Sequence, residues 1–169
     1  LVRREKMEEV IDYITELGAT SYIPVVMSRS IVKVNQEQMD KKNARYAKIA
    51  KEAAEQSHRV KIMEVKNLVT WKSFLALSNE YDLCLYAYEA SSKDDSLKQI
   101  LKNKKYSNIL VLVGPEGGIS EKEVEDLKSN GFLPISLGPR ILRTQVAPLY
   151  VMSALSYEWE AEEWELLVF

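Results

Sequence analysis

The sequence predicts an α/β domain built on a largely parallel sheet with helices on both faces. Segments rich in branched apolar residues alternate along the chain with segments that have the spacing of amphipathic helices, and this alternation is typical of parallel sheets. The chain has 169 residues, of which 46% are hydrophobic, so it can bury a sizeable core as one domain. No repeat, low-complexity stretch or linker divides it, and residues 1–169 are therefore expected to form a single domain.

The predicted elements of the first third follow from apolar spacing. Apolar side chains at 7, 10, 11, 14 and 17 recur at helical intervals, and Gly18 supplies the expected C-cap. Residues 22–26 read as a strand, in which Pro24 favours an edge or a bend. Asp40 is expected to cap a long helix that ends near residue 56 and that presents alanines at 44, 47, 50 and 54 for close packing. Residues 60–65 form a second predicted strand.

The predicted helix after residue 120 has the clearest boundaries. Ser120 and Glu123 fit a capping box, in which each side chain accepts a hydrogen bond from the other residue's free backbone N–H. Ile119 and Val124 stand at the positions of a hydrophobic staple, and Gly131 ends the helix. The remaining predicted elements are a helix at 71–77, a strand at 83–88, a helix at 97–103, a strand at 109–113, a strand at 132–137 and a helix from 144 to about 162.

Composition and charge argue against several classes of protein. The net charge of −2 does not fit a protein whose whole surface binds nucleic acid, although local clusters of lysine and arginine can contact phosphates. No apolar run approaches the ~20 residues that span a bilayer, so no membrane partner is expected. Cys84 and His58 are the only cysteine and histidine, so no Cys/His set is available for a metal. Cys84 lies in a predicted strand and is interpreted as a small core residue.

Two glycine-proline turns carry most of the functional information, and each follows a predicted strand. Gly-Pro-Glu-Gly-Gly occupies residues 114–118, and Leu-Gly-Pro-Arg-Ile-Leu-Arg-Thr occupies residues 137–144. Ligands of parallel sheets bind beyond the carboxyl ends of the strands, and glycine lets a ligand approach the main chain closely. The pair therefore predicts a pocket walled mostly by peptide groups. Arg140 and Arg143 are placed in it for anionic or nucleobase partners rather than for packing.

Other interpretations of these turns fit less well. A phosphate-binding P-loop requires a lysine before its serine, whereas Ile119 precedes Ser120 here, and the dinucleotide fingerprint is absent. A histidine-dependent catalytic triad would have to use His58, which lies at a polar helix end. A plain strand-to-helix connection explains one turn alone but not the pair.

The two turns together closely resemble those of the RsmE-type 16S ribosomal RNA (uridine-N3) methyltransferases, which belong to the SPOUT class of trefoil-knotted methyltransferases. Weaker matches extend the resemblance over nearly the whole chain: Glu-Leu-Gly at 16–18, Ser-Arg-Ser at 28–30, the helix end at 52–59, and Glu89 at the close of a strand. The resemblance implies S-adenosylmethionine as cofactor and a knotted C-terminal half. It also implies small-subunit ribosomal RNA or the assembled subunit as partner, a cytoplasmic location, and a homodimer with its active site at the interface.

The resemblance also implies roles for individual residues. The residues expected to bind the cofactor are Tyr88, Gly114, Pro115, Glu116, Gly117, Leu137, Gly138, Ile141, Leu142, Arg143 and Thr144. The residues expected to face the RNA are Arg29, Gln56, Arg59 and Arg140. Arg143 and Glu89 are the expected catalytic residues, with Arg143 stabilising the uridine anion. No general base is assigned, because Glu116 also lies near the pocket and fits a structural acceptor for turn amides equally well. No metal is expected.

The chain departs from the family pattern in three respects. Gln145 and Val146 stand where the family usually has glutamate and threonine, the first helix lacks an expected lysine near residues 12–15, and the family's N-terminal RNA-binding β-barrel domain has no counterpart here. Two alternatives therefore stay open. One is a SPOUT methyltransferase acting on ribose 2′-OH or on transfer RNA, and the other is a non-catalytic RNA-binding or assembly module that keeps the fold. A nucleotide-binding regulatory domain is disfavoured by the missing lysine and fingerprint.

Overall fold

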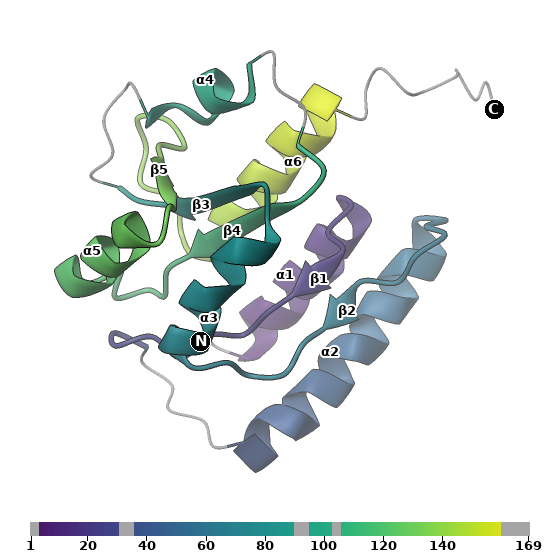
Figure 1. Ribbon diagram of the computed structural model, residues 1–169. Coiled ribbons are helices and arrows are strands. Elements are labelled where there is room, and N and C mark those ends of the chain that lie inside the picture. The colour runs from purple at the N-terminus through teal and green to yellow at the C-terminus, as the bar shows by residue number, and fades with distance from the viewer. Residues whose placement is uncertain (1–3, 31–35, 90–94, 103–105, 160–169) are drawn as a thin grey trace.

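The computed structural model describes residues 4–30, 36–89, 95–102 and 106–159 (Figure 1). The elements, in chain order, are α1 (Arg4–Glu16), β1 (Ser21–Tyr22), α2 (Gln36–Gln56), β2 (Glu64–Val65), α3 (Trp71–Ala76), the 3₁₀ helix η1 (Leu77–Glu80), β3 (Leu83–Ala87), α4 (Leu97–Leu101), β4 (Ile109–Val113), α5 (Glu121–Ser129), β5 (Leu133–Ile135) and α6 (Ala147–Trp159). Every pairing between the described strands is parallel. The predicted α/β class with a parallel sheet is therefore confirmed.

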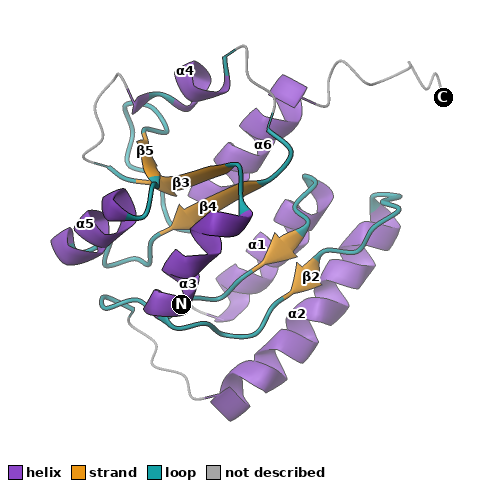
Figure 2. Ribbon diagram, viewed as in Figure 1, coloured by secondary structure: helices purple, strands orange, loops and turns teal. Residues whose placement is uncertain are grey.

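The larger sheet has the strand order β4-β3-β5, and β1 pairs with β2 in a separate two-stranded sheet (Figure 2). Leu83 lies opposite Ile109, and Ala87 lies opposite both Val113 and Ile135. The central strand β3 therefore ends level with its neighbours on either side. The three carboxyl ends form one edge of the sheet.

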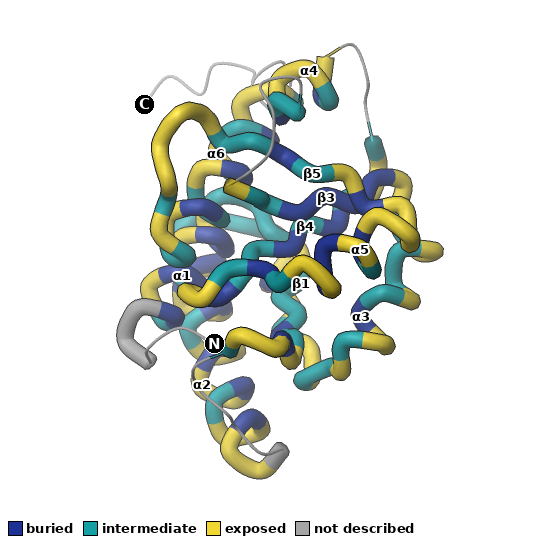
Figure 3. The backbone as a smooth tube through the Cα atoms, turned by 90° about the vertical axis from the view of Figure 1, so that its left-hand side faces the viewer, coloured by how far each residue is buried: buried dark blue, intermediate teal, exposed yellow. Residues whose placement is uncertain are grey.

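Alternate residues of β3 pack into two different cores, one on each face of the sheet. Cys84 and Tyr86 belong to a core with Phe74 of α3 and with Val124 and Leu127 of α5. Leu83 and Leu85 belong to a second core, whose other buried members are Leu97, Leu101, Ile135, Val151 and Leu155. The buried strands in Figure 3 lie between these two layers of helices. Helices thus cover both faces, as the sequence predicts.

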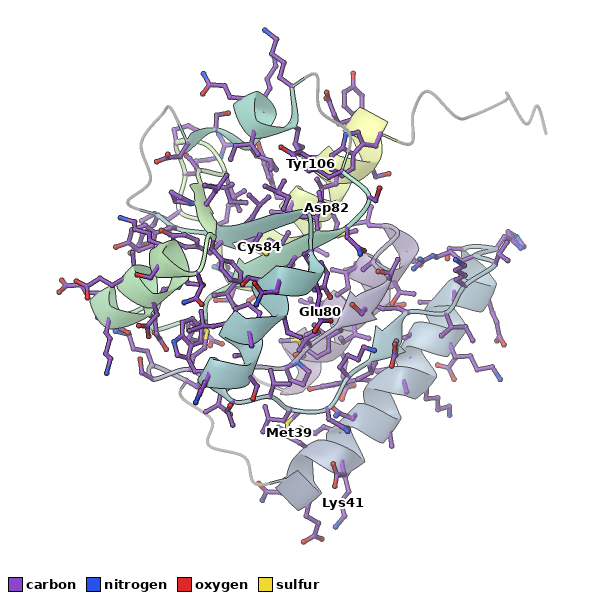
Figure 4. The ribbon with its side chains drawn as sticks, in the orientation of Figure 1. Met39, Lys41, Glu80, Asp82, Cys84 and Tyr106 are labelled. Carbon is purple, nitrogen blue, oxygen red and sulfur yellow. The ribbon has the colours of Figure 1, made fainter. Side chains whose placement is uncertain are left out.

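The cysteine is a core residue, as predicted. Cys84 is 6% exposed and lies on β3 within the packed interior (Figure 4). Burial raises the pKa of its thiol, which disfavours the nucleophilic thiolate.

A third core joins the two N-terminal helices, and here one prediction is wrong and a second holds only in part. Met7, Val10, Ile11 and Ile14 of α1 pack against α2, and α1 also contacts α6. The long helix begins at Gln36 rather than at Asp40. The alanines at 50 and 54 are buried as predicted, whereas those at 44 and 47 are exposed, because they lie off the buried side that Met39, Asn43 and Tyr46 also form.

Several predicted strands and helices are shorter in the structure. Only Glu64–Val65 of the segment 60–65 pairs, because Val60 and Ile62 are 99% and 53% exposed and face solvent. The strand predicted at 132–137 is reduced to Leu133–Ile135. The helix predicted at 97–103 covers Leu97–Leu101, and residue 103 lies outside the described residues, as do residues 160–162 of the last predicted helix.

Candidate functional site

The two glycine-proline turns flank the end of the central strand. The chain runs from β3 to β4 on one side and then, by way of α5, to β5 on the other side. This reversal is a topological switch point, the place where ligands bind in open parallel sheets. Residues 114–118 follow β4, residues 136–144 follow β5, and Tyr88 and Glu89 follow β3 between them. The sheet order therefore brings the three predicted parts of the cofactor site to one edge.

The first turn is tightly bent and fits closely against a distant segment. The Gly118 N–H donates to the Pro115 carbonyl oxygen over 2.8 Å, and Gly118 has a φ of +72°. A Cβ at Gly117 would lie 2.9 Å from the Arg29 carbonyl oxygen, so glycine is required there by close packing. Pro115 is buried, whereas Glu116 is exposed. The turn thus offers backbone and one free carboxylate to the edge of the sheet.

Arg29, predicted to face RNA, lies against this turn. Its Nη1 donates to the Gly117 and Ile119 carbonyl oxygens over 3.3 and 3.4 Å. The residue is nevertheless exposed, so part of the guanidinium remains open to a ligand. The structure therefore joins one predicted RNA contact to the predicted cofactor turn.

The second turn has a backbone that is largely unpaired. Within the described part of the chain, residues 137–142 make no hydrogen bond with any other residue. Gly138 has a φ of +97°, which glycine adopts without strain. Arg140 and Arg143 are exposed, and Ile141 is 82% exposed, while Leu142 and Thr144 are half-buried. Free amides and carbonyls beside apolar side chains are suited to holding a flat polar ligand.

A cavity with a mostly apolar wall lies mainly beside this edge rather than between the turns. It has a volume of about 500 Å³ and is lined chiefly by α1, the segment around β1, β4 and α6. Of the residues predicted to bind the cofactor, Gly114, Pro115 and Thr144 line one end of it. The remainder of its wall is mostly apolar.

The other predicted RNA contacts lie elsewhere. Arg59 donates to the carbonyl oxygens of Thr15, Ala19 and Gly18 over 2.6, 2.8 and 3.2 Å, so it caps the end of α1. Gln56 lines a groove with five carboxylates, those of Glu8, Glu9, Asp12, Glu16 and Glu52. Figure 1 shows this end of α2 and the turn before α5 on opposite sides of the molecule. Within one chain the structure does not bring these residues to the turns.

Near the end of β3, Tyr88 is held in place and Glu89 is not buried. The Tyr88 N–H donates to the Ile135 carbonyl oxygen over 3.2 Å, and its ring lies 6.0 Å from that of Tyr86, between centroids. Glu89 is exposed in the turn that follows.

The fully buried Tyr86 hydroxyl has no partner among the described residues. Burial, Tyr88 and Asp95 raise its pKa, so the phenol is neutral.

Glu123 connects the first turn to the N-terminal part of the chain, a role that the sequence analysis missed. The predicted capping box is confirmed: Ser120 Oγ accepts from the Glu123 N–H over 3.3 Å, and Glu123 Oε2 accepts from the Ser120 N–H over 2.9 Å. Glu123 Oε1 also accepts from the Ser28 N–H over 2.8 Å. The capping motif was the only local signal, and it did not indicate a partner 95 residues away.

No helix in the described ranges combines the length and the apolar character needed to cross a bilayer. Among the same residues, no three or more histidine, cysteine, aspartate or glutamate side chains are grouped so that they can hold a metal ion.

Comparison with known proteins agrees with the resemblance of the turns. The ribosomal RNA small subunit methyltransferase E of Bacillus subtilis is 42% identical to this chain over 164 residues. The match covers 95% of this chain and 64% of that protein. The enzyme of the same name from Aquifex aeolicus is 34% identical over 149 residues, which are 88% of this chain and 62% of that protein. The chain thus spans less than two thirds of the length of these relatives.

Solved structures and a family model give the same assignment. A methyltransferase from Legionella pneumophila in complex with S-adenosylmethionine superposes with a TM-score of 0.80 at 33% identity, covering 90% of this chain and 61% of that one. The ribosomal RNA small subunit methyltransferase E of Neisseria gonorrhoeae, bound to S-adenosylmethionine, superposes with a TM-score of 0.76 at 31% identity. The match covers 92% of this chain and 62% of that one. The model of the RNA methyltransferase domain matches residues 1–156. The chain therefore belongs to the RNA methyltransferase domain family, and its resemblance to the RsmE-type members is confirmed.

Proposed function

We propose that this chain is the methyltransferase domain of an enzyme that transfers a methyl group from S-adenosylmethionine to N3 of a uridine in small-subunit ribosomal RNA. The observation that carries the proposal is the pair of glycine-proline turns at the switch point of the sheet, with the backbone of residues 137–142 unpaired. The similarity to enzymes that bear this name supports the substrate class.

The residues present fit S-adenosylmethionine. Unpaired backbone donors and acceptors at 137–142 can hydrogen-bond an adenine edge, and the apolar side chains of Ile141 and Leu142 can contact its faces. The trefoil knot implied by the family is proposed for the C-terminal half of the chain. S-adenosylmethionine supplies an activated methyl group on a sulfonium, so the protein has to provide orientation and a dry site.

The nucleophile needs more help from the protein, because uridine N3 attacks only after losing its proton. Arg143 is exposed at the second turn, where its guanidinium can stabilise the negative charge on a uridine carbonyl oxygen. Glu89 after β3 and Glu116 in the first turn are exposed carboxylates, and they are the candidates for accepting the proton. No general base is assigned between them.

Residues 1–169 are proposed to form a single domain that works in the cytoplasm on small-subunit ribosomal RNA or on the assembled subunit. The chain matches only 64% and 62% of the length of two relatives, which leaves room in those proteins for a separate RNA-binding domain. Arg29 and Arg140 are the proposed RNA contacts of this domain that lie beside the turns.

We further propose a homodimer that uses α6. Val146, Tyr150 and Tyr157 are 40%, 43% and 79% exposed, and their spacing places them along one side of the helix and its N-terminal end. An exposed apolar stripe of this kind is typical of a helix packed against a partner. The family resemblance makes a second copy of this chain the partner.

Tyr157→Glu is expected to shift the chain from dimer to monomer, because it places a charge in an apolar contact. The dimer dissociation constant should rise by roughly tenfold or more, as measured by sedimentation or light scattering over a range of concentrations. Val60→Glu alters a side chain that is 99% exposed away from α6 and serves as the matched control. A Tyr157→Glu chain that stays dimeric would place the interface elsewhere.

Calorimetric titration with S-adenosylmethionine tests the proposed function most directly. One site per chain is expected, and ATP is expected to give no heat because the phosphate-binding motif is absent. The absence of S-adenosylmethionine binding would instead favour the non-catalytic RNA-binding module. If the cofactor binds, mass-spectrometric mapping of the methylated RNA atom separates uridine N3 from ribose 2′-OH or a transfer RNA target.

A further inference from the structure

The buried carboxylate of Glu123 makes more contacts than a helix cap needs. Glu123 is only 5% exposed. Oε2 accepts from the Ser120 N–H and Oγ over 2.9 and 2.7 Å, which belongs to the capping box. Oε1 accepts from the Ser28 N–H over 2.8 Å, and Ser28 Oγ donates to Ser120 Oγ over 3.2 Å. Both oxygens of one carboxylate therefore tie two distant segments together.

This carboxylate is held in its charged form. Burial by itself raises the pKa of Glu123, but the hydrogen bonds donated by Ser28 and Ser120 outweigh it and lower the pKa below the ordinary value. Glu123 is therefore ionised at neutral pH, and charge-assisted hydrogen bonds of this kind are roughly twice as strong as neutral ones.

The segment that Glu123 holds is also the support of the first turn. Immediately after Ser28, the Arg29 carbonyl oxygen and Cβ lie 2.9 and 3.0 Å from where a Cβ of Gly117 would stand. The Arg29 guanidinium donates to the Gly117 and Ile119 carbonyl oxygens. Arg29 thus lies against the turn through both its backbone and its side chain.

From these contacts we infer that Glu123 is a positioning residue for cofactor binding: it fixes the Ser28–Arg29 backbone against Gly117 and so preorganises the turn at 114–118. The inference rests on the proposed function, because it assigns the turn to S-adenosylmethionine. Glu123 touches no ligand itself and acts through Arg29. A preorganised turn binds more tightly because less ordering is required when the ligand arrives.

Glu123→Gln tests the inference with little change in volume. The amide has one acceptor and one donor group where the carboxylate has two acceptors, so at least one of the donors from Ser28 and Ser120 loses its partner. S-adenosylmethionine affinity is expected to fall about tenfold, and Arg29→Ala is expected to produce a similar fall. The two effects should not add, since both changes release the same turn. The double variant should therefore bind S-adenosylmethionine about as tightly as the weaker-binding single variant.

A control variant separates positioning from stability. Thr70→Ala removes the N-cap of α3, where Thr70 Oγ1 accepts from the Ser73 N–H over 3.2 Å. It should lower the melting temperature without altering affinity.

The outcomes discriminate between the two proposals. If the wild-type chain fails to bind S-adenosylmethionine, the proposed function is wrong. If the wild-type chain binds and Glu123→Gln binds equally well, or if its effect adds fully to that of Arg29→Ala, the positioning role is overturned. Should Glu123→Gln fail to fold, hydrogen exchange of the wild-type Ser28 amide decides, because S-adenosylmethionine is expected to slow it. An unchanged exchange rate would overturn the inference.

Discussion

Replacing Arg143 by alanine is expected to lower the rate of RNA methylation by roughly 10²- to 10³-fold, the usual cost of removing one group that stabilises developing negative charge. Cofactor affinity should change little. The part of Arg143 that supports the fold is its backbone: its carbonyl oxygen accepts from the N–H groups of Val146 and Ala147 over 2.8 and 3.0 Å at the start of α6. Alanine keeps that carbonyl, so the helix start should survive.

Transfer of a radioactive methyl group to small-subunit ribosomal RNA measures the rate, and calorimetry measures cofactor binding. Arg140→Ala is the matched control, because Arg140 is an exposed arginine on the same turn and is proposed to contact RNA rather than the reacting base. Its loss should raise KM for RNA and leave kcat largely unchanged. Full turnover by the Arg143→Ala chain would remove Arg143 from the mechanism.

Gly117→Val is expected to weaken S-adenosylmethionine binding by about 100-fold, since a shift of about 1 Å in a preorganised site can have an effect of that size. The new Cβ would stand 2.9 Å from the Arg29 carbonyl oxygen and 3.0 Å from the Arg29 Cβ. Backbone cannot yield as a flexible side chain can, so either the turn or the segment at 28–30 must move. The turn would then leave the position set by β4.

Calorimetry measures the S-adenosylmethionine affinity of Gly117→Val and of the control variant Lys128→Val. Lys128 is exposed near the end of α5, so its replacement adds a branched side chain without crowding the turn. Circular dichroism of both variants checks that the fold is intact. Wild-type affinity in a folded Gly117→Val chain would show that this turn is not a wall of the cofactor site.

The sequence predicted the elements best where local chemistry determines them. The strand at 109–113 matches β4, because an unbroken apolar run bounded by glycine leaves little choice. The start of α5 was predicted to the residue, because a capping box satisfies its own backbone groups within four residues. The strand at 22–26 was overestimated: Pro24 lacks an N–H, and pairing resumes only at the bridge between Val25 and Val69.

The placement of the two turns in the candidate site was predictable in part, again because local chemistry determines it. Each glycine-proline turn is a local motif, and parallel strands must bring their carboxyl ends to one edge. The contacts of Arg29 with Gly117 and of Ser28 with Glu123 join residues 88 and 95 positions apart, and no local pattern specifies them. Arg59 shows the converse. Its place in a family-like motif suggested an RNA contact, while the structure pairs it with three carbonyl oxygens at the end of α1 and in the turn that follows.

The position of β3 between β4 and β5 has a consequence for stability. β5 is synthesised after β3 and β4, so the carboxyl end of β3 has a neighbouring strand, and thus a wall, on one side only until β5 has docked. A small molecule that needs both walls has affinity for the complete native state and none for a partly unfolded chain. Its binding energy is then added to global unfolding, by about 2.7 kcal/mol at a free concentration 100 times its dissociation constant. In a cell rich in such a metabolite, degradation by proteases that require an open chain would slow accordingly.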